Sequence, residues 1–229
     1  MTEPGPGEAA LQRDGTTYGL VVGAAGGVVT PEDLERIART AREFDVPLIK
    51  VTTGQRIALL GIAERDLPRV AAALGLEGHR PPGPCLKYVA ACSGTAACRW
   101  GMQDALGFAS ALEARFVSRQ FPSKVKMGVS GCTRNCGTCF ARDLGFMGTA
   151  RGWMVFFGGN GGRRPRNADV VASNLAQDQA LDLATRLLEY YGANARSGER
   201  TARFVERVGL EDIRNNVLRF APYLPLDGA

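Results

Sequence analysis

Four cysteines in two pairs are the residues of this chain best suited to chemistry. Five residues separate Cys92 from Cys98, three separate Cys132 from Cys136, and both pairs lie in segments rich in glycine or serine. Thiolates bind soft metals, so four converging cysteines can hold zinc or an iron–sulfur cluster. The five-residue spacing is wide for structural zinc, and the dense cysteine run of bacterial ferredoxins is absent. The pattern predicts a metal site of a less common kind.

Two further cysteines, Cys85 and Cys139, lie outside these pairs. Cys139 follows Cys136 at a C-x2-C spacing, so it is an alternative ligand, although a packed or incidental thiol is the interpretation that we favour. All six cysteines fall between Cys85 and Cys139. A secreted disulfide scaffold is normally smaller and spreads its cysteines along the chain. We therefore expect reduced thiols and a cytoplasmic protein.

A second set of candidates is cationic. Residues 119–166 contain nine lysines and arginines against one acid, Asp143. Within this region Lys124 and Lys126 flank Val125, and on a strand both side chains would point to one face. Two converging ammonium groups can bind an oxyanion and supply protons, whereas the alternative is a strand edge protected by lysines. Nucleic-acid binding is a further alternative, and the lack of a recognisable binding motif argues against it.

The N-terminal elements suggest one half of a ferredoxin-like fold. The first 16 residues are rich in proline, glycine and charge, so we expect disorder there. Thr30 followed by Pro31 and two acids predicts a helix start. The expected order is a strand at 18–22, a helix from 31 to about 44, strands at 48–52 and 57–62, and a helix from 66 to about 74. This order is typical of half a split βαβ unit.

A loop of prolines and glycine at 81–84 marks the expected domain boundary. We predict a disordered segment at 1–16, a ferredoxin-like half-domain at 17–80 and a cysteine-bearing domain at 81–229, in the α+β class. In the second domain an amphipathic helix should follow Cys98, because apolar residues recur at helical spacing from Met102 to Phe116. The other expected elements are strands at 124–129 and 153–157 and helices at 177–191, ended by Gly192, at 199–208 and at 210–219.

The composition is that of an ordinary globular chain. The 229 residues are 45% hydrophobic and 22% charged, with a net charge of +5. The longest weakly polar stretch, residues 18–29, is short and interrupted by glycine, and no secretory signal opens the sequence. We expect no membrane association. His79 is the only histidine and lies in a polar loop, so we expect proton delivery from lysine, arginine and water.

Several segments around the cysteines resemble the siroheme-dependent nitrite and sulfite reductases. They are TAACRWG, KVKMGVSGCTRNCG, DLGFMG and GGNGG, with VPLIKVTTGQRIALLGI upstream and ERTARFVERVGL downstream. The likeness covers roughly residues 17–218. Within this family the chain resembles the stand-alone, low-molecular-weight assimilatory-type sulfite reductases and the siroheme domain of NADH-dependent nitrite reductases.

The resemblance implies a ligand set and a substrate site. It implies that Cys92, Cys98, Cys132 and Cys136 bind one [4Fe–4S] cluster and that Cys136 also bridges to the siroheme iron. It further implies that Lys124 and Lys126 bind the substrate. Gly54 stands where relatives have a substrate-binding arginine, so the further candidate cations are Arg56, two residues later, and Lys87.

Siroheme carries eight carboxylates, which fits the basic region. The glycines of 158–162 can bring backbone N–H groups close to a carboxylate. The residues expected to bind siroheme, besides Cys136, are Gly159, Asn160, Gly161, Arg163, Arg164, Arg134 and Asn135. Arg166 belongs to the same basic loop.

The predicted function is six-electron reduction of sulfite to sulfide, with nitrite reduction to ammonium as the alternative. A dinucleotide fingerprint is absent, so a ferredoxin-like or other external donor is expected. One unit stands where larger relatives have two, which suggests a homodimer. Two other functions stay open: a non-catalytic carrier of electrons or siroheme, because of Gly54, and a zinc-stabilised nucleic-acid-binding module.

Overall fold

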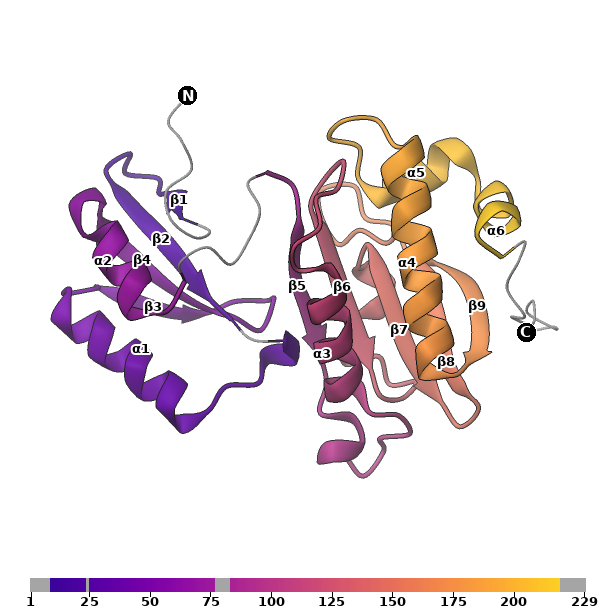
Figure 1. Ribbon diagram of the computed structural model, residues 1–229, viewed down its shortest axis with the longest axis horizontal. Helices are drawn as coiled ribbons and strands as arrows, with labels where there is room; N and C mark the ends of the chain where they lie inside the picture. The colour runs from indigo at the N-terminus through magenta and orange to yellow at the C-terminus, as the bar shows by residue number, and fades with distance from the viewer. Residues whose placement is uncertain (1–8, 24, 77–82, 219–229) are drawn as a thin grey trace. The chain divides into compact units, whose positions relative to one another are not determined.

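A computed structural model describes residues 9–23, 25–76 and 83–218, and its internal contacts divide the chain into two compact units, Met1–Pro82 and Gly83–Ala229. The first unit is a four-stranded antiparallel sheet with helices, and the second is a five-stranded mixed sheet with helices (Figure 1). The α+β class is confirmed.

The first unit has the strand order β1-β2-β4-β3. Its apolar core lies between the sheet and the helices and includes Leu20, Leu59, Ile37 and Val70. The elements run in the order β1 Ala10–Leu11, β2 Thr17–Val22, α1 Pro31–Glu43, β3 Leu48–Val51, β4 Ile57–Ala63 and α2 Leu67–Ala73, with 3₁₀ turns at Ala25–Gly27 and Glu64–Asp66.

The start of α1 follows the predicted capping chemistry. Thr30 Oγ1 accepts a hydrogen bond from Asp33 N at 3.1 Å, and Asp33 Oδ2 accepts one from Thr30 N at 3.0 Å. Pro31 occupies the first turn, where its missing N–H costs nothing. These reciprocal bonds satisfy backbone donors that would otherwise lack partners at a helix start.

The expectation of disorder over residues 1–16 is wrong for the part that the structure describes. Ala10 and Leu11 form β1 and pair with β2. Gln12 Oε1 accepts a hydrogen bond from Gly61 N at 3.0 Å, and Asp14 Oδ1 accepts bonds from the N–H groups of Thr16 and Thr17. The polar composition of this segment did not predict its order, because the contacts that order it are made with residues of β2 and β4.

The second unit is a sheet covered on one face by α3 and α4 (Figure 1). The strand order is β5-β6-β7-β8-β9; β5, β6 and β7 are parallel neighbours, whereas β8 is antiparallel to both β7 and β9. The elements are β5 Leu86–Ala91, α3 Ala105–Phe116, β6 Val125–Ser130, β7 Leu144–Thr149, β8 Gly152–Phe157, β9 Asp169–Leu175, α4 Gln177–Asn194, α5 Thr201–Val208 and α6 Leu210–Leu218, with 3₁₀ turns at Gly94–Ala96 and Cys139–Ala141.

Two predicted helix bounds need correction. The helix after Cys98 starts only at Ala105, capped by Asp104 Oδ1, which accepts from Gly107 N at 2.9 Å; Met102 lies before it and is 50% exposed. The helix α4 continues through Gly192 to Asn194. An interior glycine costs a helix only about 1 kcal/mol, which the buried face of α4 offsets.

Among the described residues, no helix is both long enough and apolar enough to cross a bilayer.

Candidate metal centre and anion site

Both cysteine pairs begin at the same edge of the second sheet. Cys92 directly follows β5, and one residue, Gly131, separates Cys132 from the end of β6. The strands are parallel, with Ala91 opposite Val129, so their carboxyl ends lie together. Cys92 N donates a hydrogen bond to Val129 O at 3.1 Å, which continues the pairing into the first cysteine loop. The topology therefore brings two loops that are distant in sequence side by side.

Glycines let these loops pack backbone against backbone. A Cβ atom on Gly131 would lie 2.7 Å from Gly94 Cα, closer than any side chain tolerates. The carbonyl of Gly131 accepts hydrogen bonds from Met102 N at 2.8 Å and Gln103 N at 3.0 Å. Gly94 has a positive φ of 52°, which favours glycine, and its carbonyl accepts from Cys98 N at 2.9 Å. The contact between the loops needs glycine at position 131, and Gly94 is required by its positive φ and by the Gln103 carbonyl oxygen, which would lie 2.7 Å from a Cβ atom there.

All four paired cysteines are free thiols. Cys132 is buried, Cys92 and Cys98 are half-buried and Cys136 is exposed. Gly131 N lies 3.1 Å from Cys92 Sγ and donates to it, and such an N–H stabilises a thiolate. Within the described ranges, no group of three or more His, Cys, Asp or Glu side chains is placed to hold a metal ion. The four-cysteine ligand set stays a prediction.

The two additional cysteines are packed in the interior. Cys139 Sγ lies 3.2 Å from Ser130 Oγ and 3.0 Å from Phe146 O. Burial raises the pKa of Cys139 to about 11, so it stays a neutral thiol at ordinary pH. Cys85 is only 1% exposed. These surroundings agree with the interpretation of Cys139 as a packed thiol.

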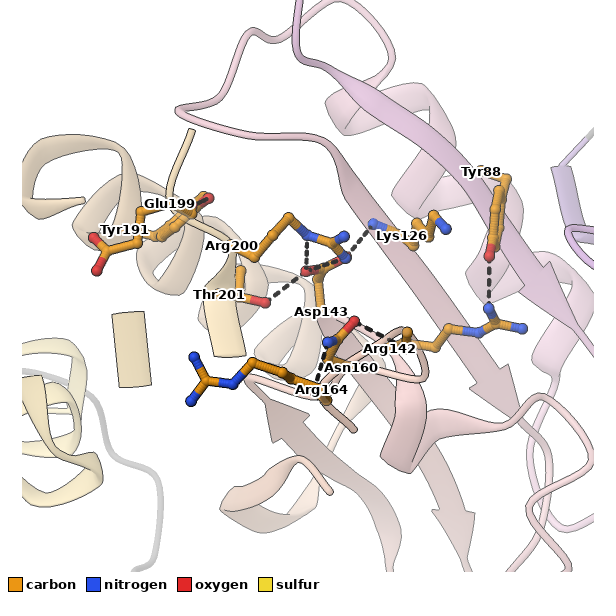
Figure 2. Close-up of polar contacts among 11 residues, drawn as sticks. Tyr88, Lys126, Arg142, Asp143, Asn160, Arg164, Tyr191, Glu199, Arg200 and Thr201 are labelled. Atoms are coloured by element: carbon orange, nitrogen blue, oxygen red, sulfur yellow. Dashed lines mark hydrogen bonds and ion pairs between the residues drawn. The ribbon is translucent and has the colours of Figure 1, made fainter. Parts of the chain in front are cut away.

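Cations gather around Tyr88 on the sheet face that α3 and α4 leave uncovered. Tyr88 on β5 is paired with Lys126 on β6, and the Lys126 ammonium lies 5.7 Å from the Tyr88 ring centre. Arg142 approaches the same ring at 5.2 Å and donates a hydrogen bond from Nη1 to Tyr88 Oη at 2.6 Å (Figure 2). Arg142 Nε is buried and has no acceptor among the described residues.

The two lysines differ in exposure, because Lys124 is exposed whereas Lys126 is half-buried. β6 starts at Val125, so Lys124 precedes the strand and is exposed. Partial burial lowers the pKa of Lys126, and the nearby charges of Lys124, Arg200 and Arg142 lower it further, against the opposing effect of Asp143. Lys126 therefore lies in a positively charged environment, which favours binding of an anion.

Asp143, the one acid of the basic region, is a fully buried acceptor. It accepts hydrogen bonds from Lys126 N at 2.9 Å and Thr201 Oγ1 at 2.6 Å, and its Oδ2 forms an ion pair with Arg200 at 2.7 Å (Figure 2). Its own N–H donates to Lys126 O at 3.0 Å. Asp143 thus fixes the backbone beneath Lys126 and joins it to the start of α5.

The glycine-rich loop after β8 packs against the segment that carries Arg142. A Cβ atom on Gly159 would lie 2.4 Å from the carbonyl oxygens of Phe140 and Arg142. Asn160 shapes the loop: its Nδ2 donates to Arg164 O at 2.8 Å and its Oδ1 accepts from Gly162 N. The predicted cofactor contacts of this loop stay predictions; Gly161, Arg163 and the Arg164 side chain lie at its exposed surface.

Two other predicted cofactor residues make contacts within the cysteine loops. Asn135 has a positive φ of 56°, and its Oδ1 accepts a hydrogen bond from Cys139 N at 2.7 Å. Arg134 lies over the ring of Trp100 at 4.4 Å. Both side chains therefore have structural partners close to Cys136.

The two further candidate cations lie in different units. Arg56 belongs to the first unit, where its N–H donates to Thr52 Oγ1 at 3.1 Å and its side chain packs against Gly23. Lys87 lies on β5 next to Tyr88 and is half-buried. His79 lies outside the described residues.

Sequence reasoning missed the polar partners of the basic residues. Arg142 and Tyr88 are 54 positions apart, and Asp143 and Arg200 are 57 apart, so no local pattern connects them. The sequence did contain one indication of the ion pair: Asp143 is a single acid among many bases, and a charged residue that is buried is usually paired. The residues that the structure adds are Tyr88, Arg142, Asp143, Arg200 and Thr201.

Comparisons with known proteins agree with the two units. A family model described as the nitrite and sulphite reductase 4Fe-4S domain matches residues 82–222, and one described as the nitrite/sulfite reductase ferredoxin-like half domain matches residues 10–76. The chain is 43% identical to an assimilatory-type sulfite reductase of Nitratidesulfovibrio vulgaris, over 93% of this chain and 98% of that protein.

Larger proteins share the same region. The chain is 39% identical to a nitrite reductase [NAD(P)H] of Bacillus subtilis, over 90% of this chain but 26% of that protein. The crystal structure of a dissimilatory sulfite reductase I has the same fold, with a TM-score of 0.75 and 14% identity over 88% of this chain and 69% of that chain.

Proposed function

The chain belongs to the nitrite and sulfite reductase family, and from this premise we propose that it reduces sulfite to sulfide with electrons from an external donor. It is an oxidoreductase of a family that carries siroheme and a [4Fe–4S] cluster. The observation that carries the proposal is the side-by-side placement of the two cysteine loops at the ends of β5 and β6, with an N–H group directed at Cys92 Sγ.

Cys92, Cys98, Cys132 and Cys136 would hold the cluster, and Cys136 would also meet the siroheme iron. The donor set fits, because four free thiols supply the soft ligands that iron–sulfur clusters require. Cys136 is exposed, as a cysteine that faces a large cofactor must be. When bound, the two groups would relay electrons from the external donor and supply the metal at which the anion is reduced.

The residues around Tyr88 would bind the anionic groups and deliver protons. Lys126, Lys124 and Arg142 provide positive charge, and the buried Arg142 Nε–H still needs an acceptor. The lowered pKa of Lys126 makes its ammonium a better proton donor than an ordinary lysine. Each oxygen that leaves the substrate as water takes up two protons, so a donor held beside the anion speeds reduction.

Nitrite is the alternative substrate. The similarity to a B. subtilis nitrite reductase favours it, whereas the similarity over nearly the full length of a sulfite reductase favours sulfite. Turnover of the holoenzyme with each anion and a reduced viologen dye tests both. We expect a higher kcat/KM for sulfite; a higher value for nitrite would reverse the assignment, and no turnover with either would contradict a reductase.

A homodimer and a cytoplasmic location complete the proposal. A half domain matches residues 10–76, and a second copy of the chain would supply the other half. The free cysteines of the described residues suit a reducing compartment.

A further inference from the structure

Ser130 is a buried polar residue at the base of the second cysteine loop. It is the last residue of β6 and is only 1% exposed. A buried hydroxyl normally has a hydrogen-bond partner, because leaving it without one costs free energy. Ser130 Oγ accepts a hydrogen bond from Gly137 N at 2.8 Å, and Cys139 Sγ lies 3.2 Å from it. Ser130 therefore joins the end of the strand to the returning side of the loop.

The part of the loop that carries Cys136 is a strained turn. Asn135 and Thr138, on either side of it, have positive φ values of 56° and 55°. This left-handed conformation is unfavourable for residues with a Cβ atom, and more so for β-branched threonine than for asparagine. Such backbone persists only where its surroundings hold it in place.

Bonds within the turn set its shape. Thr138 N donates to Asn135 O at 2.9 Å, and Cys139 N donates to Asn135 Oδ1 at 2.7 Å. Both bonds join residues of the 135–139 segment to one another. The bond from Gly137 N to Ser130 Oγ instead joins the turn to β6.

The pattern of exposure shows what this attachment does. Gly137 is buried, whereas Cys136, the residue before it, is exposed. A Cβ atom on Gly137 would lie 2.3 Å from Val129 O, so glycine lets the backbone approach β6 closely enough to reach the Ser130 hydroxyl. With Gly137 held against the strand, the chain presents the Cys136 thiol at the surface.

We propose that Ser130 is a positioning residue of the reductase: its hydroxyl holds the turn of residues 135–138 against β6 and so sets the position of Cys136. The proposal rests on the proposed function, in which Cys136 is the ligand shared by the two metal groups. Ser130 acts through Gly137 and does not itself bind the anion. A small displacement of a reacting group costs a large part of the rate, so the hydroxyl should affect turnover more than substrate binding.

The test compares three variants of the full-length holoenzyme. Ser130→Ala removes the acceptor of Gly137 N, and Ser130→Thr keeps a hydroxyl at that position. Ser173→Ala is the matched control, because Ser173 lies on β9 of the same sheet and its buried Oγ has no partner among the described residues. Hydrogen–deuterium exchange of the peptide covering residues 131–138 reports the turn. Sulfite turnover with a reduced viologen dye, normalised to bound siroheme, reports the position of Cys136.

We expect Ser130→Ala to speed exchange in this peptide about tenfold, because a buried N–H loses its partner. Exchange in α4 should stay as in the wild type, which shows that the fold is kept. The kcat of Ser130→Ala should fall about tenfold while KM for sulfite stays within about twofold. Ser130→Thr and Ser173→Ala should match the wild type in both measurements.

Unchanged exchange in Ser130→Ala would show that the hydroxyl does not hold the turn. Faster exchange with wild-type kcat would reduce the bond to a structural contact, and an equal loss in Ser130→Thr would assign the effect to packing. Each of these results would overturn the proposal. Absence of dye-driven turnover in the wild type would instead contradict the proposed function, while the exchange measurement would still decide whether Ser130 holds the turn.

Discussion

Lys126 shows how the environment of one residue connects to activity. Its side chain is half-buried beside Tyr88 and Arg142, and other cations lie near it. Burial and like charges both favour the neutral amine, so the pKa of Lys126 lies below the usual 10.5. In our proposal the same residue binds anions while protonated and gives up its proton readily.

The pH dependence of turnover follows from this pKa. Because only the ammonium binds the anion, kcat/KM for sulfite should fall as pH rises, starting below pH 10.5. Lys126→Arg should keep anion binding to higher pH, since arginine stays charged, but should lower kcat. A pH profile of the holoenzyme measures both effects. If kcat/KM of Lys126→Arg falls at the same alkaline pH as that of the wild type, the fall reports the titration of another group.

Cys139 differs from the predicted ligand Cys136 in exposure, and therefore in reactivity toward an alkylating reagent. Cys139 is buried, with its pKa raised to about 11, whereas Cys136 is exposed. In the cofactor-free protein, iodoacetamide should therefore label Cys136 and leave Cys139 unmodified, because alkylation requires an accessible thiolate. Peptide mass spectrometry gives the readout.

A pair of alanine variants extends this comparison to iron binding. Cys139→Ala should retain the iron of the wild type and lose about 1 kcal/mol of stability for the vacated volume. Cys136→Ala should lose iron. Loss of iron in Cys139→Ala would favour the C-x2-C alternative.

Among the elements, Asp143 joins the start of β7 to β6 and α5. Asp143→Asn removes a buried charge from Arg200 and weakens its bonds to Thr201 and Lys126. The expected loss is about 3 kcal/mol, at the low end for buried pairs because Arg200 is partly exposed. Urea unfolding of the cofactor-free protein measures it.

Asp169→Asn is the matched control for this prediction. Asp169 pairs with Arg166 within the same unit, but its carboxylate keeps contact with water. Such partly exposed pairs contribute at most about 1 kcal/mol. If both variants lost the same free energy of unfolding, the ion pair of Asp143 would contribute no more stability than a partly exposed pair.

The sequence predicted elements well where local chemistry defines them. The threonine cap and Pro31 predict α1, and the strands expected at 57–62 and 153–157 correspond to β4 and β8. The sequence predicts no strand at β5, β7 or β9, because their short apolar runs lack the alternation that would distinguish a strand from a buried helix segment. Gly192 predicts a helix end that the structure does not have, because the glycine signal ignores the tertiary packing of α4.

The sequence indicates which loops form the candidate site, whereas the four-cysteine ligand set and the roles of the cations stay predictions. Spacing and flanking residues indicated the cysteines, and the structure places their loops together. The partnership of Tyr88 with Arg142 depends on strand register, which the sequence does not specify. The same holds for Arg134, whose stacking on Trp100 joins two loops that are far apart in sequence.

At the scale of the whole molecule, assembly is the open proposal. If a second copy completes the half domain, light scattering of the holoenzyme should give a mass of about twice 24.4 kDa. A single-chain mass at working concentration would contradict the homodimer and leave the proposed chemistry unaffected, because all four predicted ligands lie in one unit.

In our proposal the four paired cysteines hold a [4Fe–4S] cluster beside siroheme. Iron, acid-labile sulfide and the absorption spectrum of the anaerobically purified protein test it most directly. The expected result is about five irons and about four sulfides per chain, with the visible absorption of a reduced porphyrin macrocycle. A colourless protein that contains zinc and no iron would contradict the claim.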